Sequence, residues 1–162
     1  MQDYLACWSG HFDLLDPQRP FLQVPALADA GLNLSPWTRL ALERSSGAAR
    51  LIWDHSIDAH PTPLGLAAIA RLLVAHLQFT PGGLVKALRT SAVRGPASGL
   101  LLMLPAGETL QETLALGLIG QNRERFAADL PAWERPALTV EQLRRPGETV
   151  LEGPAHRYTF LS

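Results

Sequence analysis

Residues 54 to 63, DHSIDAHPTP, bring four side chains suited to acid–base or metal chemistry into seven positions: Asp54, His55, Asp58 and His60. Two carboxylates and two imidazoles could hold zinc or another transition metal and activate a water molecule for hydrolysis. The spacing argues against this, because the histidines lie five residues apart and the prolines at 61 and 63 prevent a helix that would align them. A metal-dependent hydrolase is therefore the weaker hypothesis, and a solvated loop with local hydrogen bonds is the plainer one.

A second stretch, TPGGLVKALRTSAVRG at residues 80 to 95, combines adjacent glycines with positive charge. The two glycines could simply end a preceding helix. Alternatively, they let the backbone approach another molecule closely, and cations just beyond them could pair with phosphates. The residues from 59 to 107 contain no Asp or Glu, although the formal net charge of the whole chain is only −1. The candidate DNA-binding residues in this window are Pro81, Gly82, Gly83, Lys86, Arg89 and Arg94.

Other kinds of chemistry find little support in the sequence. Cys7 is the single cysteine, which excludes an intramolecular disulfide and a multi-cysteine zinc site and fits a reducing cytoplasm. We expect this cysteine to be a small buried hydrophobe. No GxSxG or GxxxxGK[ST] motif occurs, so we expect a protein without catalysis and without a cofactor. The longest apolar stretch, GLLLMLPA, is too short to cross a bilayer, so we expect a cytoplasmic protein with no membrane contact.

The elements that must position these stretches follow from composition and periodicity. Thirteen prolines and thirteen glycines among short apolar stretches predict one irregular, loop-rich α+β domain over residues 1–162. We expect two main apolar helices, at 64–79 and 108–120, with short helices at 36–44 and 139–145. Short strands are expected at 50–53 and, buried, at 99–104, where so short an apolar run also fits a helix. Prolines prevent a helix through 12–25. In the second main helix, the side chains expected to face inward are Leu110, Leu114, Leu116 and Leu118.

Five stretches in order resemble the large subunit (CasA family) of the type I-E CRISPR surveillance complex, Cascade. They are FDLLDPQRPFLQV at 12–24, LSPWTRLALERSSGAARLIWDH at 34–55, LGLAAIARLLVAHLQFTPGG at 64–83, LPAGETLQETLALGLI at 104–119, and AWERP at 132–136. Members of that family are several hundred residues long and carry a C-terminal helical bundle. The resemblance therefore implies part of the N-terminal domain, as a fragment or a shortened form without the bundle.

The resemblance also implies a function in RNA-guided antiviral defence. In this family, guide pairing reads the target sequence, while the large subunit reads a protospacer-adjacent motif from the DNA minor groove and helps to recruit a helicase-nuclease. By position, the family's glycine loop falls on Pro81, Gly82 and Gly83. The loop that contacts the 5′ handle of the guide RNA falls on Asp54, His55, Ser56, Ile57, Asp58, Ala59 and His60.

The partners that the resemblance implies are other Cascade subunits, the CRISPR guide RNA, double-stranded target DNA and the helicase-nuclease. The main alternative is a protein-interaction scaffold that contacts only other Cascade subunits. The carboxylates Asp54 and Asp58 would repel phosphates, so in a guide-RNA loop they are expected to bond a base edge or another part of the protein.

Overall fold

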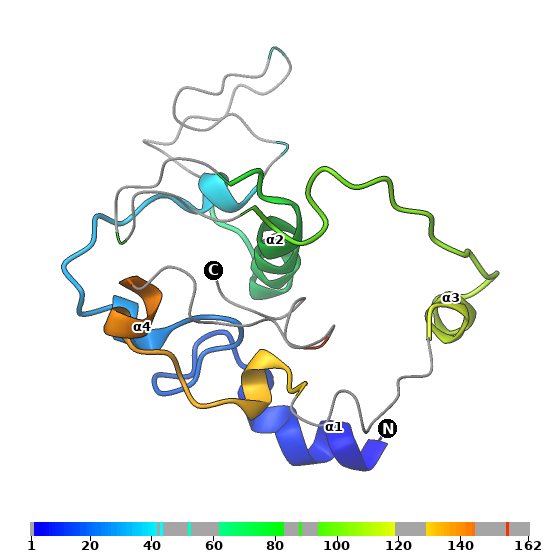
Figure 1. Ribbon diagram of the computed structural model, residues 1–162, viewed down its shortest axis with the longest axis horizontal. Helices are drawn as coiled ribbons and strands as arrows, with labels where there is room; N and C mark the ends of the chain where they lie inside the picture. Colours follow the sequence, from blue (N-terminus) through cyan, green and yellow to red (C-terminus); the bar gives the residue numbers. More distant parts are fainter. Residues whose placement is uncertain are drawn as a thin grey trace.

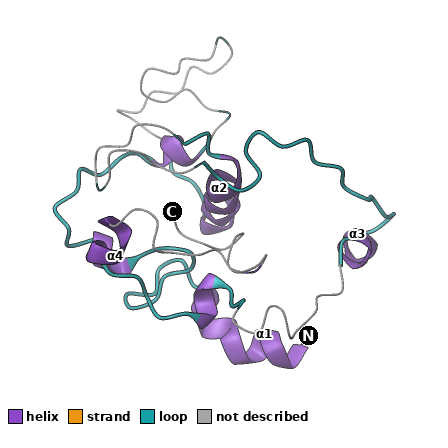
Figure 2. Cartoon of the chain, viewed as in Figure 1, coloured by secondary structure: helices purple, strands orange, loops and turns teal. Residues whose placement is uncertain are grey.

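The computed structural model describes residues 2–41, 43, 52, 62–82, 88, 94–118, 129–144 and 155. Short helices joined by long loops make up this part of the chain, and it contains no strand (Figures 1 and 2). The α-helices are α1 (Gln2–Trp8), α2 (Leu66–Phe79), α3 (Leu110–Leu116) and α4 (Val140–Arg144). The 3-10 helices are η1 (Ser9–Phe12), η2 (Pro25–Leu27), η3 (Trp37–Leu40) and η4 (Ala132–Glu134).

An aromatic cluster joins the N-terminal loop to a segment more than a hundred residues later. The Phe12 ring packs edge-on against Phe21, with centroids 5.5 Å apart, and against Trp133, with centroids 5.6 Å apart. Tyr4 on α1 donates a hydrogen bond to the Glu134 carboxylate, and its hydroxyl accepts one from the Trp133 indole at 2.9 Å. Two of the motif stretches, at 12–24 and 132–136, therefore pack on each other.

Local hydrogen bonds turn the proline-rich segment back on itself. Phe21 donates its backbone N–H to the Asp13 carbonyl at 2.8 Å, which closes a turn across the prolines. The Asp16 carboxylate accepts backbone N–H groups from Arg19 and Gln18, and these two bonds lower the pKa of Asp16 below its ordinary value. The guanidinium of Arg19 in turn donates to the Arg135 carbonyl at 2.8 Å. The prediction that no regular helix runs through 12–25 is confirmed: only its end residues Phe12 and Pro25 belong to 3-10 helices, and the chain between them is turned.

The predicted apolar helix at 64–79 is confirmed as α2, which begins two residues later at Leu66. The 3-10 helix η3 packs on α2. His76 lies in the last turn of α2, and its buried Nδ1 atom has no hydrogen-bond partner. The imidazole ring forms a hydrogen bond with the Leu40 backbone. Nε2 is therefore the atom that donates to the Leu40 carbonyl. Of the helix predicted at 36–44, the structure shows a 3-10 helix over Trp37–Leu40, which ends where the Ala41 backbone becomes extended.

Two further sequence predictions for the N- and C-terminal helices have opposite outcomes. The capping box at Thr139 and Gln142 is confirmed: Thr139 N–H donates to the Gln142 side chain at 2.8 Å, and Gln142 N–H donates to Thr139 Oγ1 at 3.3 Å. The prediction that Cys7 is buried is wrong, because α1 has no buried residue and Cys7 is exposed.

The segment after residue 99 departs most from the sequence prediction. Residues 99–104 form no strand and are exposed, so the buried strand predicted there is wrong. The helix predicted at 108–120 is confirmed over Leu110–Leu116, with Thr109 as its N-cap. Its leucines are 55% to 74% exposed. The prediction that they face inward is therefore wrong. Amphipathic periodicity predicts an apolar face, but the described chain supplies no surface to cover it.

Protonation of His76 should make folding stability depend on pH. Burial lowers the pKa of His76 below 6.5, and the bond to Leu40 opposes this shift only in part. The unfolded chain therefore binds the proton more tightly, and stability is lost as pH falls through about 6.5. We expect a lower urea midpoint at pH 5.5 than at pH 7.5, and a smaller difference for His76→Gln. An unchanged difference in that variant would assign the pH dependence to other groups.

Candidate nucleic-acid interface

Helix α2 carries the two candidate loops, one before its first residue and one after its last. The chain that contains residues 54–60 returns to the body at Thr62, whose carbonyl accepts a hydrogen bond from the Trp37 indole at 3.0 Å. At its other end, the same segment follows η3. The hydrogen bond between His76 and the Leu40 backbone holds η3 against α2. Both ends of that segment are thus anchored to the surroundings of one helix.

The base of the second loop is closed by backbone hydrogen bonds at the C-terminus of α2. Gly95 N–H donates to the Thr80 carbonyl at 2.8 Å, and Ala97 N–H donates to the Gln78 carbonyl at 3.0 Å. These bonds satisfy carbonyl groups that a helix end leaves without an intrahelical partner. The chain consequently leaves α2 at Thr80 and returns to the same point at Gly95.

Gly95 is the residue that makes this closure possible. A Cβ atom there would overlap the Gln78 carbonyl oxygen and would lie 2.7 Å from the Leu77 carbonyl oxygen. Both obstacles are backbone atoms of α2, so they cannot rotate away as a flexible side chain would. The sequence prediction missed Gly95, although the Gly-Pro pair directly after a basic stretch was a signal for a close approach.

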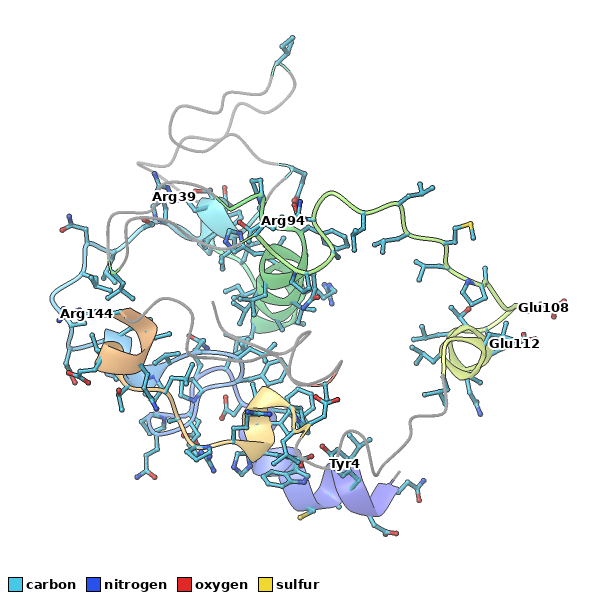
Figure 3. The ribbon with its side chains drawn as sticks, in the orientation of Figure 1. Tyr4, Arg39, Arg94, Glu108, Glu112 and Arg144 are labelled. Atoms are coloured by element: carbon cyan, nitrogen blue, oxygen red, sulfur yellow. The ribbon has the colours of Figure 1, made fainter. Side chains whose placement is uncertain are left out.

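One anchor of the first loop, His76, lies close to the base of the second loop along α2. His76, which fixes the exit of the first loop, precedes Thr80 by four residues, about one helical turn. The exposed Arg39 belongs to η3, which packs on α2, and Figure 3 shows it in the same part of the molecule as Arg94. Arg39 was not among the predicted residues, because its position depends on the Leu40–His76 contact.

Three of the predicted DNA-binding residues are described. Pro81 is exposed, and Gly82 has a φ of 72°, a left-handed conformation that favours glycine. Arg94 is exposed, and its guanidinium lies next to the turn at Gly99. The remaining members, Gly83, Lys86 and Arg89, lie outside the described residues, and so does the whole candidate guide-RNA loop from Asp54 to His60.

The weaker hypothesis, a metal-dependent hydrolase, is likewise untested. Its candidate residues Asp54, His55, Asp58 and His60 lie outside the described part of the chain. Among the residues that the structure covers, no group of three or more His, Cys, Asp or Glu side chains could hold a metal ion. None of the helices in that part is long and apolar enough to cross a membrane. Around α2, the described residues provide two anchored loop bases, a left-handed glycine and exposed arginines.

Comparison with known proteins gives the class of protein to which this arrangement belongs. The profile of the family described as CRISPR-associated protein Cse1 matches residues 1–162. The CRISPR-associated protein CasA/Cse1 of Thermus thermophilus is 36% identical over 144 residues, which are 88% of this chain and 28% of that protein. The chain is thus similar to components of CRISPR systems. It belongs to the CRISPR-associated protein Cse1 family, as the five sequence stretches predicted.

Solved structures of CasA from the same organism support this family membership. A crystal structure of Thermus thermophilus CasA superposes with a TM-score of 0.76 at 32% identity, covering 98% of this chain and 30% of that one. A second structure of Thermus thermophilus CasA (Cse1) gives a TM-score of 0.77 at 32% identity and covers 99% of this chain and 31% of the other. The chain therefore spans about three tenths of the length of the relatives that it matches.

The closure at Gly95 can be tested by adding one methyl group. We expect Gly95→Ala to destabilise the fold by about 1–3 kcal/mol, because its Cβ must displace the backbone of α2. Gly10→Ala is the matched control, since a Cβ at Gly10 meets nothing within 4 Å. The free energies of unfolding from urea titrations would decide, and equal values for the two variants would contradict the proposed role of Gly95.

Proposed function

We propose that this chain is a non-catalytic, nucleic-acid-binding part of a Cascade large subunit in RNA-guided antiviral defence. The observation that carries the proposal is the closed loop base at α2. Backbone bonds from Gly95 and Ala97 to Thr80 and Gln78 bring together the two ends of the segment that contains residues 81–94. Membership of the Cse1 family over the entire chain gives this loop its proposed ligand.

Residues 81–94 are proposed to contact double-stranded DNA beside the protospacer-adjacent motif. Gly82, with its φ of 72°, supports a backbone that can approach the sugar–phosphate chain without a side chain between them. Lys86, Arg89 and Arg94 supply positive charge with no acidic residue from 59 to 107 to offset it. Contacts with phosphates position a protein on the duplex, and a minor-groove approach reads sequence only coarsely.

Residues 54–60 are proposed to contact the 5′ handle of the guide RNA. Support comes from the anchoring of the neighbouring chain: Trp37 holds Thr62, and η3 holds the opposite end against α2. Because these anchors lie on the helix that carries the DNA loop, one rigid element can position both. The partners proposed with this role are other Cascade subunits, guide RNA, target DNA and the helicase-nuclease that the assembled complex recruits.

The glycine loop is tested by bulky substitution in a complex reconstituted with this chain. Gly82→Val requires a β-branched residue at positive φ and adds bulk where the DNA would approach. We expect weaker binding to motif-bearing duplex in a filter-binding or mobility-shift assay. Gly31→Val is the matched control, because Gly31 has a φ of 66° and lies far from the loop in the sequence. Equal losses in the two variants would show a general folding effect and refute DNA contact by the glycine loop.

Charge reversal separates a DNA-binding loop from a scaffold that contacts only protein subunits. We expect Lys86→Glu combined with Arg89→Glu to weaken duplex binding. The slope of log affinity against log salt concentration should fall by up to about 2, for two lost phosphate contacts. The control is Arg71→Glu combined with Arg144→Glu, which changes the net charge equally at two exposed arginines outside the loop. Normal duplex binding by the Lys86/Arg89 variant within an assembled complex would favour the scaffold.

A further inference from the structure

A cavity of about 110 Å³ lies between the loop at residues 19–25 and the segment at residues 132–138. Apolar side chains make up most of its described lining, and Phe21, Leu22 and Trp133 are among them. An engineered apolar cavity of about 150 Å³ is known to bind benzene. Every described lining residue is partly or fully exposed, so the cavity opens to solvent. It therefore has room for one aromatic ring that enters from outside.

The Arg19 guanidinium joins the two walls of this cavity. It donates a hydrogen bond to the Arg135 carbonyl at 2.8 Å and another to His11 Nε2 at 2.9 Å. A guanidinium has five N–H groups, and these two contacts use one each. No Asp or Glu side chain among the described residues forms a hydrogen bond or an ion pair with this guanidinium. Arg19 thus keeps three donors and its positive charge for a ligand.

His11 holds this guanidinium in place. Because a guanidinium only donates, Nε2 of His11 is the acceptor, and the neutral ring carries its hydrogen on Nδ1. That Nδ1 atom is buried and has no hydrogen-bond partner, while the ring packs edge-on against Trp8 with centroids 5.0 Å apart. His11 is therefore a positioning residue, and Arg19 is the residue that would contact a ligand.

Leu22 adopts an unfavourable backbone conformation in the wall of the cavity. Its φ is 51°, and among the described residues it is the only non-glycine residue with a positive φ. A branched side chain adopts this left-handed conformation only where its surroundings hold it there. The Phe21 N–H bond to the Asp13 carbonyl and the Gln23 N–H bond to the Pro20 carbonyl do so on either side. Backbone strain of this kind concentrates at ligand-binding sites.

The charges around the cavity favour a ligand with a single negative charge. None of the described lining residues is acidic, whereas Arg19 and Arg135 are cationic. Two acidic residues adjoin the lining: Asp16 accepts backbone N–H groups of its own turn, and Glu134 accepts the Tyr4 hydroxyl. Their charges oppose a dianion such as a phosphate monoester. A carboxylate carries one charge and matches the planar fork of a guanidinium.

We propose that this cavity binds an aromatic carboxylate, with the ring against Phe21, Leu22 and Trp133 and the carboxylate on the Arg19 guanidinium. This chemistry has two sources, a free small molecule or the C-terminal residue of a peptide that ends in an aromatic side chain. None of the described lining residues belongs to α2 or to the candidate loops. The proposal therefore does not depend on the proposed contacts with nucleic acid.

The test titrates the isotope-labelled chain with benzoate and with benzamide, an uncharged molecule of nearly the same shape. The indole N–H resonance of Trp133 reports on the cavity, and Trp133→Phe identifies it among those of the four tryptophans. We expect benzoate to shift this resonance with a dissociation constant of about 0.1–10 mM. Benzamide should bind at least about tenfold more weakly, because it lacks the charge-assisted hydrogen bonds to Arg19.

Two variants locate the ligand. Ala137 is exposed and lines the cavity, so Ala137→Phe should fill the space and weaken benzoate binding at least about tenfold. Ala67→Phe is the matched control, at an exposed alanine of α2 outside the described lining. Arg19→Met should remove the preference for benzoate over benzamide and leave the affinity for benzamide nearly unchanged.

The source of the carboxylate is distinguished by N-acetylphenylalanine. Binding at least about tenfold tighter than that of benzoate, and lost when the carboxylate is replaced by an amide, identifies the C-terminal residue of a peptide. Weaker or equal binding identifies a free aromatic carboxylate.

Equal affinities of the unmodified chain for benzoate and benzamide overturn the proposal. The same holds if benzoate leaves the Trp133 resonance unshifted at about ten times the largest expected dissociation constant. Equal effects of Ala137→Phe and Ala67→Phe would place the ligand elsewhere and also refute it. If circular dichroism shows that Ala137→Phe does not fold, the comparison of benzoate with benzamide in the unmodified chain still decides.

Discussion

The close approach of Gly95 to the last turn of α2 is the constraint on which the candidate interface depends. Two backbone hydrogen bonds, from Gly95 to Thr80 and from Ala97 to Gln78, occupy the carbonyl groups at the helix end. Everything between these residues must leave and re-enter at one point, and everything after Gly99 must start from it. A methyl group at residue 95 would collide with backbone atoms, so the geometry tolerates only glycine there.

Local signals in the sequence predicted the parts of the fold that are determined locally. The apolar period and flanking prolines located α2, and the Thr139–Gln142 pair located the start of α4. What the sequence could not predict depended on contacts between distant residues. The contact of His76 with the Leu40 backbone joins η3 to α2, and no local pattern reveals that contact. The predicted inward face of α3 was wrong for the same reason, since periodicity identifies an apolar face but not whether a surface meets it.

The candidate interface was predicted mainly by resemblance, because residue types alone left each stretch ambiguous. Asp54, His55, Asp58 and His60 suggested a metal site by type but not by spacing, and paired glycines after a helix are equally typical of a helix end. The structure adds the anchoring that resemblance lacked: Trp37 bonded to Thr62, and Gly95 bonded to Thr80. It also shows that η3, which carries Arg39, packs on α2, a contact that the linear sequence does not reveal.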